Sequence, residues 1–386
     1  MAYCLLKPGS EKPIKKGHPW VYAGSLERVE AEGGQVVEVL DHRGRFIAKG
    51  HFHPRSPVAI RILTWRREAI DRRFFRRRIE EAFGLRIPLE GITSAMRLVN
   101  FEGDLLPGLA IDRYGDYLSV QIHTEGMDRL REMMLGILGE LLSFKGIYER
   151  SDAEVREREG LGPSEGPLLG EVPEVVEVRE GDVRFLVDIC RGQKTGFYLD
   201  QRENRLLVRR LSEGKKVLDC FCYTGGFSVS ALKGGAKEVK AVDSSWRALE
   251  LLRENVKVNA LPQERCIIEK ADVFDFLRGD RDRYDLIILD PPPFARSRQE
   301  VPQAIKGYVE LNRLAMRRLR KGGLLLTCCC TQRVSREEFF GAVLEAGRSS
   351  GRMLQVLHCA RAPIDHPVLS SHPEGDYFKA LLLRVL

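Results

Sequence analysis

The sequence predicts an α/β protein of more than one domain, in which a doubly wound parallel sheet forms the C-terminal half. The chain has 386 residues, which exceeds the usual size of one domain and suggests two or three. Short alternating apolar segments broken by Gly and Pro fill the first 75 residues. From about Asp188 onward, strand and helix patterns alternate, which favours βαβ units and a parallel sheet.

The N-terminal segments QVVEVL (35–40) and VAIRIL (58–63) predict a small β-barrel over residues 1–75. The apolar spacing from Asp71 to Phe83 predicts a helix that leads into a second unit. Residues 76–187 are expected to form an α+β middle domain, with a strand at 118–122, a helix at 127–142 and an acidic Gly/Pro-rich loop at 161–182.

The C-terminal domain, residues 188–386, is expected to contain the parallel sheet. Its predicted strands are 216–221, 238–243, 285–290 and 323–328, and its predicted helices include 246–259 and 303–319.

Positive charge is concentrated at the N-terminus. The whole chain carries a formal net charge of +7, whereas residues 1–80 alone hold 17 Lys and Arg against nine Asp and Glu. A basic module on a near-neutral remainder is typical of nucleic-acid binding, because neutralised phosphates release counterions. The alternative is a solvated helix face, formed by Arg72, Arg73, Arg76, Arg77 and Arg78.

The nine cysteines are scattered without CxxC pairs or histidine partners at zinc-ligand spacing. This pattern indicates free thiols and neither a disulfide framework nor a metal site. No apolar run approaches the ~18 residues of a membrane-spanning helix, and the start of the chain lacks a secretory signal. We therefore expect a cytoplasmic protein without a membrane role.

A glycine-containing turn, DCFCYTGGF (219–227), follows the first predicted strand of the C-terminal half. In a doubly wound sheet, such a turn lets the backbone approach a ligand beyond the carboxyl ends of the strands. The pattern is not GxGxxG, which disfavours a dinucleotide dehydrogenase. Asp243 closes the next strand, where a carboxylate can accept hydrogen bonds from ribose hydroxyls. Alternatively, Asp243 caps the following helix.

Two more acidic residues follow predicted strands. Asp272 ends the third strand and could accept an adenine amino group, and Asp290 ends the fourth and precedes the run PPPF (291–294). Prolines keep the backbone rigid and remove N–H donors, so that a carboxylate and neighbouring carbonyls can face a planar substrate.

These motifs carry two resemblances to known families. HPWVYAGSLERVE (18–30) together with KGHFHPRSPVAIRIL (49–63) resembles the PUA domain, a compact RNA-binding barrel, and so favours RNA as the partner of the basic module. The C-terminal half, with the glycine turn, Asp243, Asp272 and DPPPF in order, resembles a Rossmann-like class I methyltransferase that depends on S-adenosylmethionine.

Further motifs narrow the resemblance, namely RGQKTGFYLDQRENR (191–205), VLDCFCYTGGFSVSAL (217–232), DPPPF and DHPVLSSHPEGDYFK (365–379). They are similar to the RlmI-type family of 23S ribosomal RNA large-subunit methyltransferases, which make 5-methylcytosine. The match covers nearly the whole chain. It implies 23S rRNA as the partner, either free or in an assembling large subunit, and leaves the oligomeric state open, a homodimer included.

The resemblance also implies roles for individual residues. Cofactor binding falls to Gln201, Asp219, Phe221, Gly225, Gly226, Asp243, Asp272 and Asp290, and RNA contact to Lys194, Tyr198, Arg202, Pro291 and Phe294. In the family, the strand after the Asp-Pro-Pro strand ends in a Ser-Cys-Ser-like triplet whose central Cys is the nucleophile. This places the role on Cys329, within LTCCCTQR (326–333), and we expect Cys328 and Cys330 to be packing residues.

A thiol suits methylation of cytosine at C5. C5 is a poor nucleophile, but addition of a thiolate at C6 makes the ring enamine-like, so that C5 can attack a methyl group before a base removes the C5 proton. The implied role of Asp290 is to hydrogen-bond the N3 and amino edge of the ring. The thiol must be largely in the thiolate form at a pH below its free pKa of about 8.5. Arg333 is a candidate for the group that lowers this pKa.

Other functions remain open at this point. Asp-Pro-Pro-aromatic motifs also serve methylation of adenine or guanine amino groups, which needs no cysteine, and uracil C5 methylation needs a cysteine as cytosine does. A noncatalytic RNA-binding assembly factor would keep the sheet as a scaffold and would not depend on Cys329. Phe294 fits either stacking on an extruded base or packing in the core.

Overall fold

The computed structural model describes residues 2–386, which form two compact units built from separate stretches of chain. Unit 1 consists of residues up to Val178, Val187–Leu199 and Ile364–Gly375. Unit 2 consists of Arg179–Leu186, Asp200–Pro363 and Asp376–Leu386. The predicted division into 1–75, 76–187 and 188–386 stays a prediction. The return of residues 364–375 to unit 1 has no counterpart in the sequence analysis.

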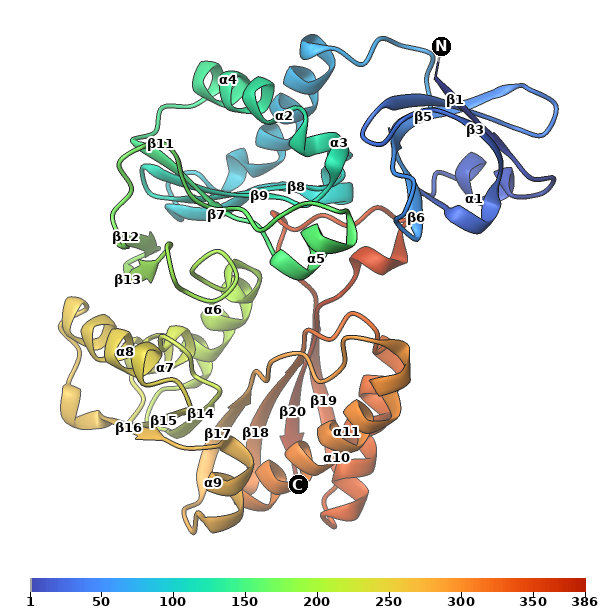
Figure 1. The fold of residues 1–386 in the computed structure, drawn as a ribbon. Helices are drawn as coiled ribbons and strands as arrows, with labels where there is room; N and C mark the ends of the chain where they lie inside the picture. The colour runs from blue at the N-terminus through green and yellow to red at the C-terminus, as the bar shows by residue number, and fades with distance from the viewer. Residues whose placement is uncertain (1) are drawn as a thin grey trace. The chain divides into compact units, whose positions relative to one another are not determined.

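Unit 1 begins with a six-stranded sheet in the order β2-β6-β5-β4-β1-β3, shown in blue in Figure 1. Alternate side chains of its strands are buried around Cys4, Val37 and Ile60, which confirms the predicted small β module. Its elements are β1 (Tyr3–Leu6), α1 (Glu11–Lys15), β2 (Trp20–Tyr22), β3 (Leu26–Glu30), β4 (Val36–Leu40), β5 (Phe46–Phe52) and β6 (Val58–Thr64).

A five-stranded sheet in the order β11-β10-β9-β8-β7 forms the rest of the unit 1 core. The predicted helix at 71–83 is α2, capped by the Asp71 side chain, which accepts a hydrogen bond from the Phe74 backbone N–H. The elements are α2 (Arg72–Arg86), β7 (Ala95–Asn100), β8 (Leu109–Tyr114), β9 (Tyr117–Ile122), α3 (Glu125–Asp128), α4 (Arg131–Leu141), β10 (Gly146–Arg150), α5 (Ala153–Arg158) and β11 (Glu165–Gly170).

Two sequence predictions for this region need correction. The helix expected at 127–142 is confirmed as α4 over 131–141, but it does not extend back to Met127, because α3 ends at Asp128 and α4 begins at Arg131. The stretch 161–182 is not a loop, because it contains β11 and β12 (Val175–Glu180), and β12 pairs with β13 (Val183–Asp188). The side chains of β12 alternate strictly between exposed and buried, a pattern that the Gly and Pro residues around it obscured.

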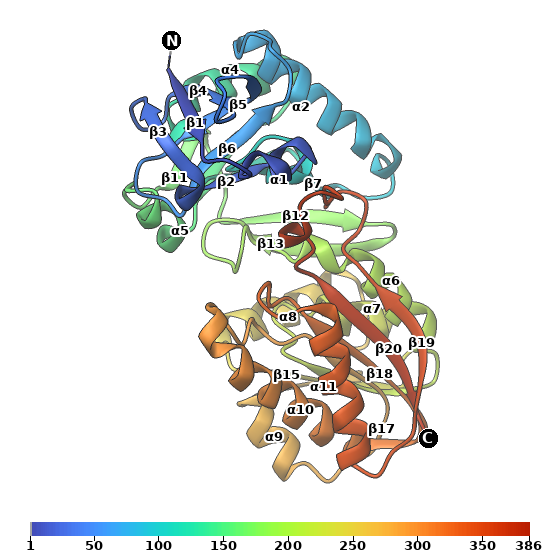
Figure 2. The same cartoon turned by 90° about the vertical axis from the view of Figure 1, so that its right-hand side faces the viewer.

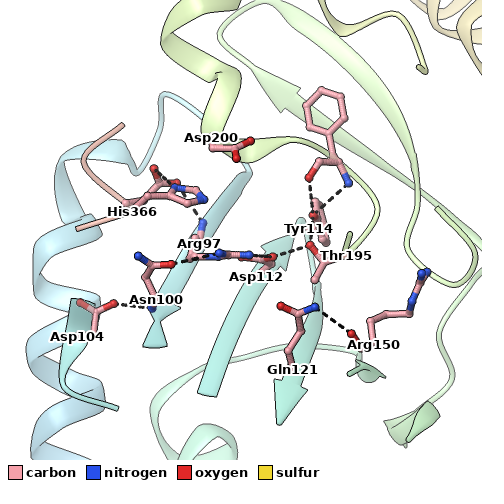
Figure 3. Close-up of polar contacts among 12 residues, drawn as sticks. Arg97, Asn100, Asp104, Asp112, Tyr114, Gln121, Arg150, Thr195, Asp200 and His366 are labelled. Carbon is pink, nitrogen blue, oxygen red and sulfur yellow. Dashed lines mark hydrogen bonds and ion pairs between the residues drawn. The ribbon is translucent and has the colours of Figure 1, made fainter. Parts of the chain in front are cut away.

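A buried polar network holds the middle of unit 1 together (Figure 3). Arg97 donates two hydrogen bonds to the carboxylate of Asp112, at 2.7 and 2.9 Å, and Thr195 Oγ1 donates to the same carboxylate at 2.5 Å. The Tyr114 hydroxyl lies 2.9 Å from Thr195 Oγ1. The returning tail joins this network, since Asp365 Oδ2 accepts from the Arg97 backbone N–H at 3.1 Å.

The arginines of α2 are largely neutralised by carboxylates. Arg72 and Arg76 both pair with Glu140, at 2.6 and 2.8 Å. Arg77 pairs with Glu68 at 2.8 Å, and Arg78 pairs with Glu81 at 3.2 Å. Such exposed pairs contribute little stability, but they leave little free charge for phosphates. The structure therefore supports the alternative of a solvated helix face for this segment.

Unit 2 is built on a seven-stranded sheet in the order β16-β15-β14-β17-β18-β20-β19. The strand order reverses between β14 and β17, as the predicted doubly wound arrangement requires. Its strands are β14 (Lys216–Cys220), β15 (Glu238–Asp243), β16 (Cys266–Lys270), β17 (Tyr284–Leu289), β18 (Leu319–Cys329), β19 (Leu354–Ala360) and β20 (Lys379–Val385).

Helices cover both faces of this sheet, and Figures 1 and 2 show α7 and α8 on one face and α9, α10 and α11 on the other. The helices of unit 2 are α6 (Arg202–Leu211), α7 (Gly226–Lys233), α8 (Trp246–Val258), α9 (Val273–Gly279), α10 (Val301–Arg318) and α11 (Arg336–Ser349). The sheet is mixed and not all parallel, because β20 runs antiparallel to both β18 and β19. Within residues 2–386, no helix has the length and apolar character needed to cross a membrane.

The turn between β14 and α7 is tight and left-handed. Phe221, Tyr223 and Gly225 have φ values of 61°, 48° and 80°. A Cβ atom on Gly225 would come within 2.5 Å of the Leu252 Cγ atom. Gly225 is therefore required both for its backbone conformation and for the close approach of α8.

We expect Gly225→Ala to lower the free energy of unfolding by at least about 1–2 kcal/mol, the cost of a left-handed L-residue. Gly341→Ala is the matched control, because Gly341 lies inside α11 and a Cβ atom added to it would meet nothing within 4 Å. The control should gain up to about 1 kcal/mol of helix stability. Urea unfolding of the three proteins measures both effects, and an unchanged midpoint for Gly225→Ala would contradict this account.

Candidate active site

The carboxylate of Asp243 fixes the turn after β14. Its Oδ2 accepts a hydrogen bond from the Tyr223 backbone N–H at 2.9 Å, and its Oδ1 accepts from the Ser245 backbone N–H at 2.8 Å. Ser245, and not Asp243, is the N-cap of α8, so the capping alternative does not apply. Each carboxylate oxygen retains a second lone pair, which leaves Asp243 able to accept a ribose hydroxyl.

Asp219 is a fully buried carboxyl beneath this turn. Its Oδ2 accepts a hydrogen bond from Ser228 Oγ at 2.6 Å, and its buried Oδ1 has no hydrogen-bond partner among residues 2–386. Burial raises the pKa of Asp219 to about 7, and the negative charges of Asp290 and Asp243 act in the same direction. A buried acceptor without a donor beside a left-handed turn fits a ligand that carries a donor or a positive charge, as S-adenosylmethionine does.

The other residues predicted to contact the cofactor lie around the same turn. Phe221 is half-buried and packs against the core, and Gly226 is the first residue of α7. Asp272 does not end a strand, because β16 stops at Lys270 and Asp272 caps α9 by accepting from the Asp275 backbone N–H at 3.1 Å. Asp272 is nevertheless exposed at the end of β16, where its second oxygen could accept an amino group.

Gln201 lies just before α6, with its side chain 2% exposed. Its Oε1 accepts a hydrogen bond from the Asn204 amide at 2.7 Å and lies 4.0 Å from the Cys328 sulfur. Arg202 is also only 2% exposed. This burial does not support its predicted contact with RNA. Gln201 is therefore linked to the strand that carries the cysteines.

Lys194 and Tyr198, predicted to contact RNA, belong to unit 1. The Lys194 ammonium lies 4.6 Å from the centre of the Tyr198 ring, and the Tyr198 hydroxyl donates to Gln193 at 2.5 Å. Lys194 is exposed and Tyr198 is half-exposed. This cation–π pair forms a small surface of the kind that suits a base and a phosphate.

The segment after β17 begins with Asp290, which is half-buried at the end of the strand. Pro291 is buried, whereas Pro292 and Pro293 are exposed. The Phe294 ring packs against Tyr308 with its centre 4.7 Å away. The ring is half-buried against the core, and its stacking on a base stays a prediction.

The three adjacent cysteines point to different places because side chains alternate along a strand. Cys328 is fully buried on the face of Gln201, and burial raises the pKa of its thiol well above the usual range. Cys329 is also fully buried, but within the apolar cluster of α9, α10 and α11 on the opposite face. Cys330 follows the end of β18, is half-buried, and its sulfur lies 3.4 Å from the Pro291 carbonyl oxygen.

Residues that the sequence analysis did not single out hold the segment after Cys330. Thr331 is fully buried, and its Oγ1 accepts from the Phe294 backbone N–H at 3.1 Å and lies 2.7 Å from the Tyr308 hydroxyl. Lys379 donates from its Nζ to the Thr331 carbonyl at 2.9 Å. A lysine that opens the strand KALLLRV, in which the next four residues are apolar, is the one sequence signal that could have revealed this contact.

The carboxyl ends of β14, β15, β17 and β18 lie at one edge of the sheet because these strands are parallel. That edge gathers the left-handed turn, Asp219, Asp243, Asp290 and Cys330. It thus combines acceptors for a nucleoside-containing cofactor with a partly accessible thiol and a carboxylate.

Comparison with known proteins agrees with this arrangement. A PUA-like domain model matches residues 5–65, and an S-adenosylmethionine-dependent methyltransferase model matches residues 163–384. The chain is 39% identical over 392 residues to ribosomal RNA large subunit methyltransferase I of Klebsiella pneumoniae subsp. pneumoniae, covering 99% of this chain and 98% of the relative. The protein of the same name from Escherichia coli O127:H6 is also 39% identical, with 99% of each chain covered.

Among solved structures, the crystal structure of the methyltransferase SMU.776 complexed with SAH matches with a TM-score of 0.89, 24% identity and 100% coverage of both chains. At this identity the likeness supports the fold. The two sequence relatives match over nearly the full length at 39% identity, which shows family membership as well as fold. The chain therefore belongs to the ribosomal RNA large subunit methyltransferase I family of S-adenosylmethionine-dependent methyltransferases.

Proposed function

We propose that the protein methylates C5 of a cytosine in large-subunit 23S ribosomal RNA, in the cytoplasm, through a covalent bond between Cys330 and C6 of the base. The relatives named ribosomal RNA large subunit methyltransferase I support the RNA substrate. The observation that carries the thiol assignment is the contact of 3.4 Å between the Cys330 sulfur and the Pro291 carbonyl, next to Asp290.

The surroundings of the cysteines argue against the predicted nucleophile, Cys329. A thiol inside an apolar cluster is a small packing residue, and Cys329 lies on the face of the sheet covered by α9 to α11. Cys330 lies at the edge where the strands end. A Ser-Cys-Ser-like triplet centred on Cys330 also places a hydroxyl residue, Thr331, in its third position.

Separate residues of this chain bind the cofactor, attack the base and hydrogen-bond its edge. S-adenosylmethionine, held by Asp219, Asp243 and the turn between them, supplies an electrophilic methyl group. The thiolate of Cys330 adds to C6 and makes C5 nucleophilic; after methylation a base removes the C5 proton, the S–C6 bond breaks and its electron pair returns to sulfur. Asp290 hydrogen-bonds the N3 and amino edge of the cytosine and stabilises charge on the ring.

We expect Cys330→Ala to lower methyl transfer by about a thousandfold or more, because the covalent route is lost. Cys328→Ala and Cys329→Ala are the matched controls and should retain activity within about threefold, since they remove only packing atoms. The assay transfers labelled methyl groups to unmodified 23S rRNA and identifies the nucleoside by mass spectrometry.

Each rival function gives a different result in this assay. A methylated amino group, with activity retained in Cys330→Ala, would replace the proposal with methylation of adenine or guanine. A 5-methyluridine product would move the substrate to uracil, and absence of any transfer would favour a noncatalytic assembly factor. Loss of activity in Cys329→Ala alone would return the nucleophile to Cys329. RNA containing 5-fluorocytidine adds a direct test. A base can remove hydrogen from C5 as a proton but cannot remove fluorine as a cation, so the S–C6 bond cannot break by elimination and the covalent adduct should accumulate.

We propose that the N-terminal sheet contributes electrostatic binding to RNA. Lys12, Lys16 and Arg43 are exposed, and none has a carboxylate within 4.0 Å among residues 2–386. This distinguishes them from the paired arginines of α2. All three lie in the region that matches the PUA-like model.

We expect the affinity for rRNA to fall steeply with salt concentration. The triple variant Lys12→Ala, Lys16→Ala and Arg43→Ala should reduce the slope of log K against log salt by about 0.7–0.9 for each lost phosphate contact. The control, Arg76→Ala with Arg77→Ala, should leave the slope nearly unchanged because those cations are already paired. Filter binding at several salt concentrations measures the slopes, and a flat profile for the wild type would contradict an electrostatic role.

We also propose that two copies of the chain pair through β19, which is an edge strand of the seven-stranded sheet. Its sequence LQVLHCA carries no Lys, Glu or Pro of the kind that normally protects an edge strand. Val356 and Leu357 are 52% and 50% exposed. An antiparallel, two-fold pairing would provide hydrogen-bond partners for the outer backbone N–H and C=O groups of β19 and would cover both side chains.

Sedimentation velocity tests the dimer, with Leu357→Lys expected to convert it to a monomer because a buried charge would oppose pairing. Leu344→Lys is the control, since Leu344 is also 50% exposed but lies on α11. A monomeric wild type, or a dimer that withstands Leu357→Lys, would refute pairing through β19.

A further inference from the structure

Lys379 is a buried cation beside the cysteine strand. It is the first residue of β20, its exposed fraction is 2%, and its cross-strand partner in β18 is Cys329. Lysine is almost never fully buried without a partner of opposite charge. Its Nζ instead donates to two backbone carbonyls, those of Thr331 at 2.9 Å and Val334 at 2.6 Å.

No carboxylate lies within 4.0 Å of the Lys379 ammonium in the part of the chain that the structure describes. The charged and titratable groups that face it are Arg336 of α11, Asp376 and the thiols of Cys329 and Cys330. Arg336 and Asp376 lie 3.4 Å from each other, so each already has a partner of opposite charge. Burial lowers the pKa of Lys379, while the two thiols and Asp376 raise it.

The two carbonyls that Lys379 binds belong to the segment that directly follows Cys330. Thr331 is held from three sides, by the Phe294 backbone N–H, the Tyr308 hydroxyl and the Lys379 ammonium. Removal of the ammonium would free the Thr331 and Val334 carbonyls and loosen the segment next to the thiol. A neutral donor could also hold two carbonyls, and so this contact alone does not explain a buried charge.

We propose that Lys379 is a positioning residue that holds the segment after Cys330 and, through its positive charge, favours the thiolate form of Cys330. This inference rests on the thiol mechanism proposed above. The charge acts twice in that mechanism, when sulfur carries a negative charge before attack on C6 and when the S–C6 bond breaks and the electron pair returns to sulfur. Lys379 transfers no proton.

Three further groups lie near the cysteines and carry no positive charge. The thiol of Cys328 interacts with both Cys330 and Asp290, and Tyr308 faces both Cys329 and Cys330. None of these groups carries a positive charge, so none of them supplies the charge that favours a thiolate. Arg333, the cation suggested by the sequence, is exposed. Lys379 is a buried cation that interacts electrostatically with both Cys329 and Cys330.

The test compares wild type with Lys379→Gln, which keeps a hydrogen-bond donor and removes the charge, and Lys379→Arg, which keeps the charge. Alkylation of Cys330 by iodoacetamide is followed as a function of pH by mass spectrometry of the tryptic peptide 322–333, with Cys330→Ala marking the site. Lys240→Gln is the matched control, because Lys240 is a largely buried cation of the same sheet that pairs with Asp282 at 3.2 Å.

We expect the midpoint of alkylation in Lys379→Gln to rise by about one pH unit, which lowers the rate at a fixed lower pH by about tenfold. Methyl transfer should fall in parallel and recover as the pH is raised. Lys379→Arg and Lys240→Gln should keep the wild-type midpoint. Thermal unfolding of each variant checks that it is folded.

The outcomes separate this inference from the mechanism on which it rests. A folded Lys379→Gln protein with the wild-type midpoint overturns the role of the charge while leaving the nucleophile intact. If Lys379→Gln does not fold, Lys379→Arg decides, because a raised midpoint in a variant that retains the charge overturns the proposal and a wild-type midpoint supports it. Full methyl transfer by Cys330→Ala would instead remove the thiol mechanism itself.

Discussion

Side chains alternate between the two faces of a β-strand, and this alternation at the end of β18 determines what each of three adjacent thiols can do. Cys328 points toward Gln201, Cys329 points into the apolar cluster, and Cys330 lies beyond the last strand residue. A shift of one residue would exchange these environments. The pairing of β18 with β17 and β20 fixes the register, and so the chemistry of the site depends on backbone hydrogen bonds within the sheet.

The same sheet edge concentrates negative charge. Asp219, Asp243 and Asp290 follow or end neighbouring strands, and Asp219 is buried deeply enough that its pKa approaches neutrality. A positively charged cofactor relieves part of this repulsion. On the other side of β18, Lys379 adds the opposite charge close to the thiols. The site is therefore divided into a region that suits a cation and a region that suits a thiolate.

Much of this architecture could be predicted from the sequence. The strands of unit 2 have short apolar runs with clear borders, and Asp243 and Asp290 were identified because they follow such runs. The missed features depend on long-range contacts. The antiparallel insertion of β20 brings Lys379 next to β18, and nothing local in either segment encodes that pairing. Likewise, the neutralised arginines of α2 depend on Glu68 and Glu140, which lie outside the helix.

The choice of nucleophile among the three adjacent cysteines illustrates a different limit. Three identical adjacent residues give no local signal of alignment. The central cysteine of the family triplet can therefore be aligned with either Cys329 or Cys330. Only the end of the strand distinguishes them, and strand ends are the least certain part of any inference from local sequence.

The return of residues 364–375 to unit 1 has a consequence for how the chain folds. Asp365 accepts from Arg86 and from the backbone of Arg97 across sequence separations of 279 and 268 residues. During synthesis, the N-terminal part of the chain is made long before Asp365 is added. The donors of Arg86 and Arg97 therefore lack these acceptors until late in synthesis. Late closure of such large loops is slow. We therefore expect the first unit to mature only after the second unit has been synthesised, and a fragment that ends near Val178 would lack part of its own polar core.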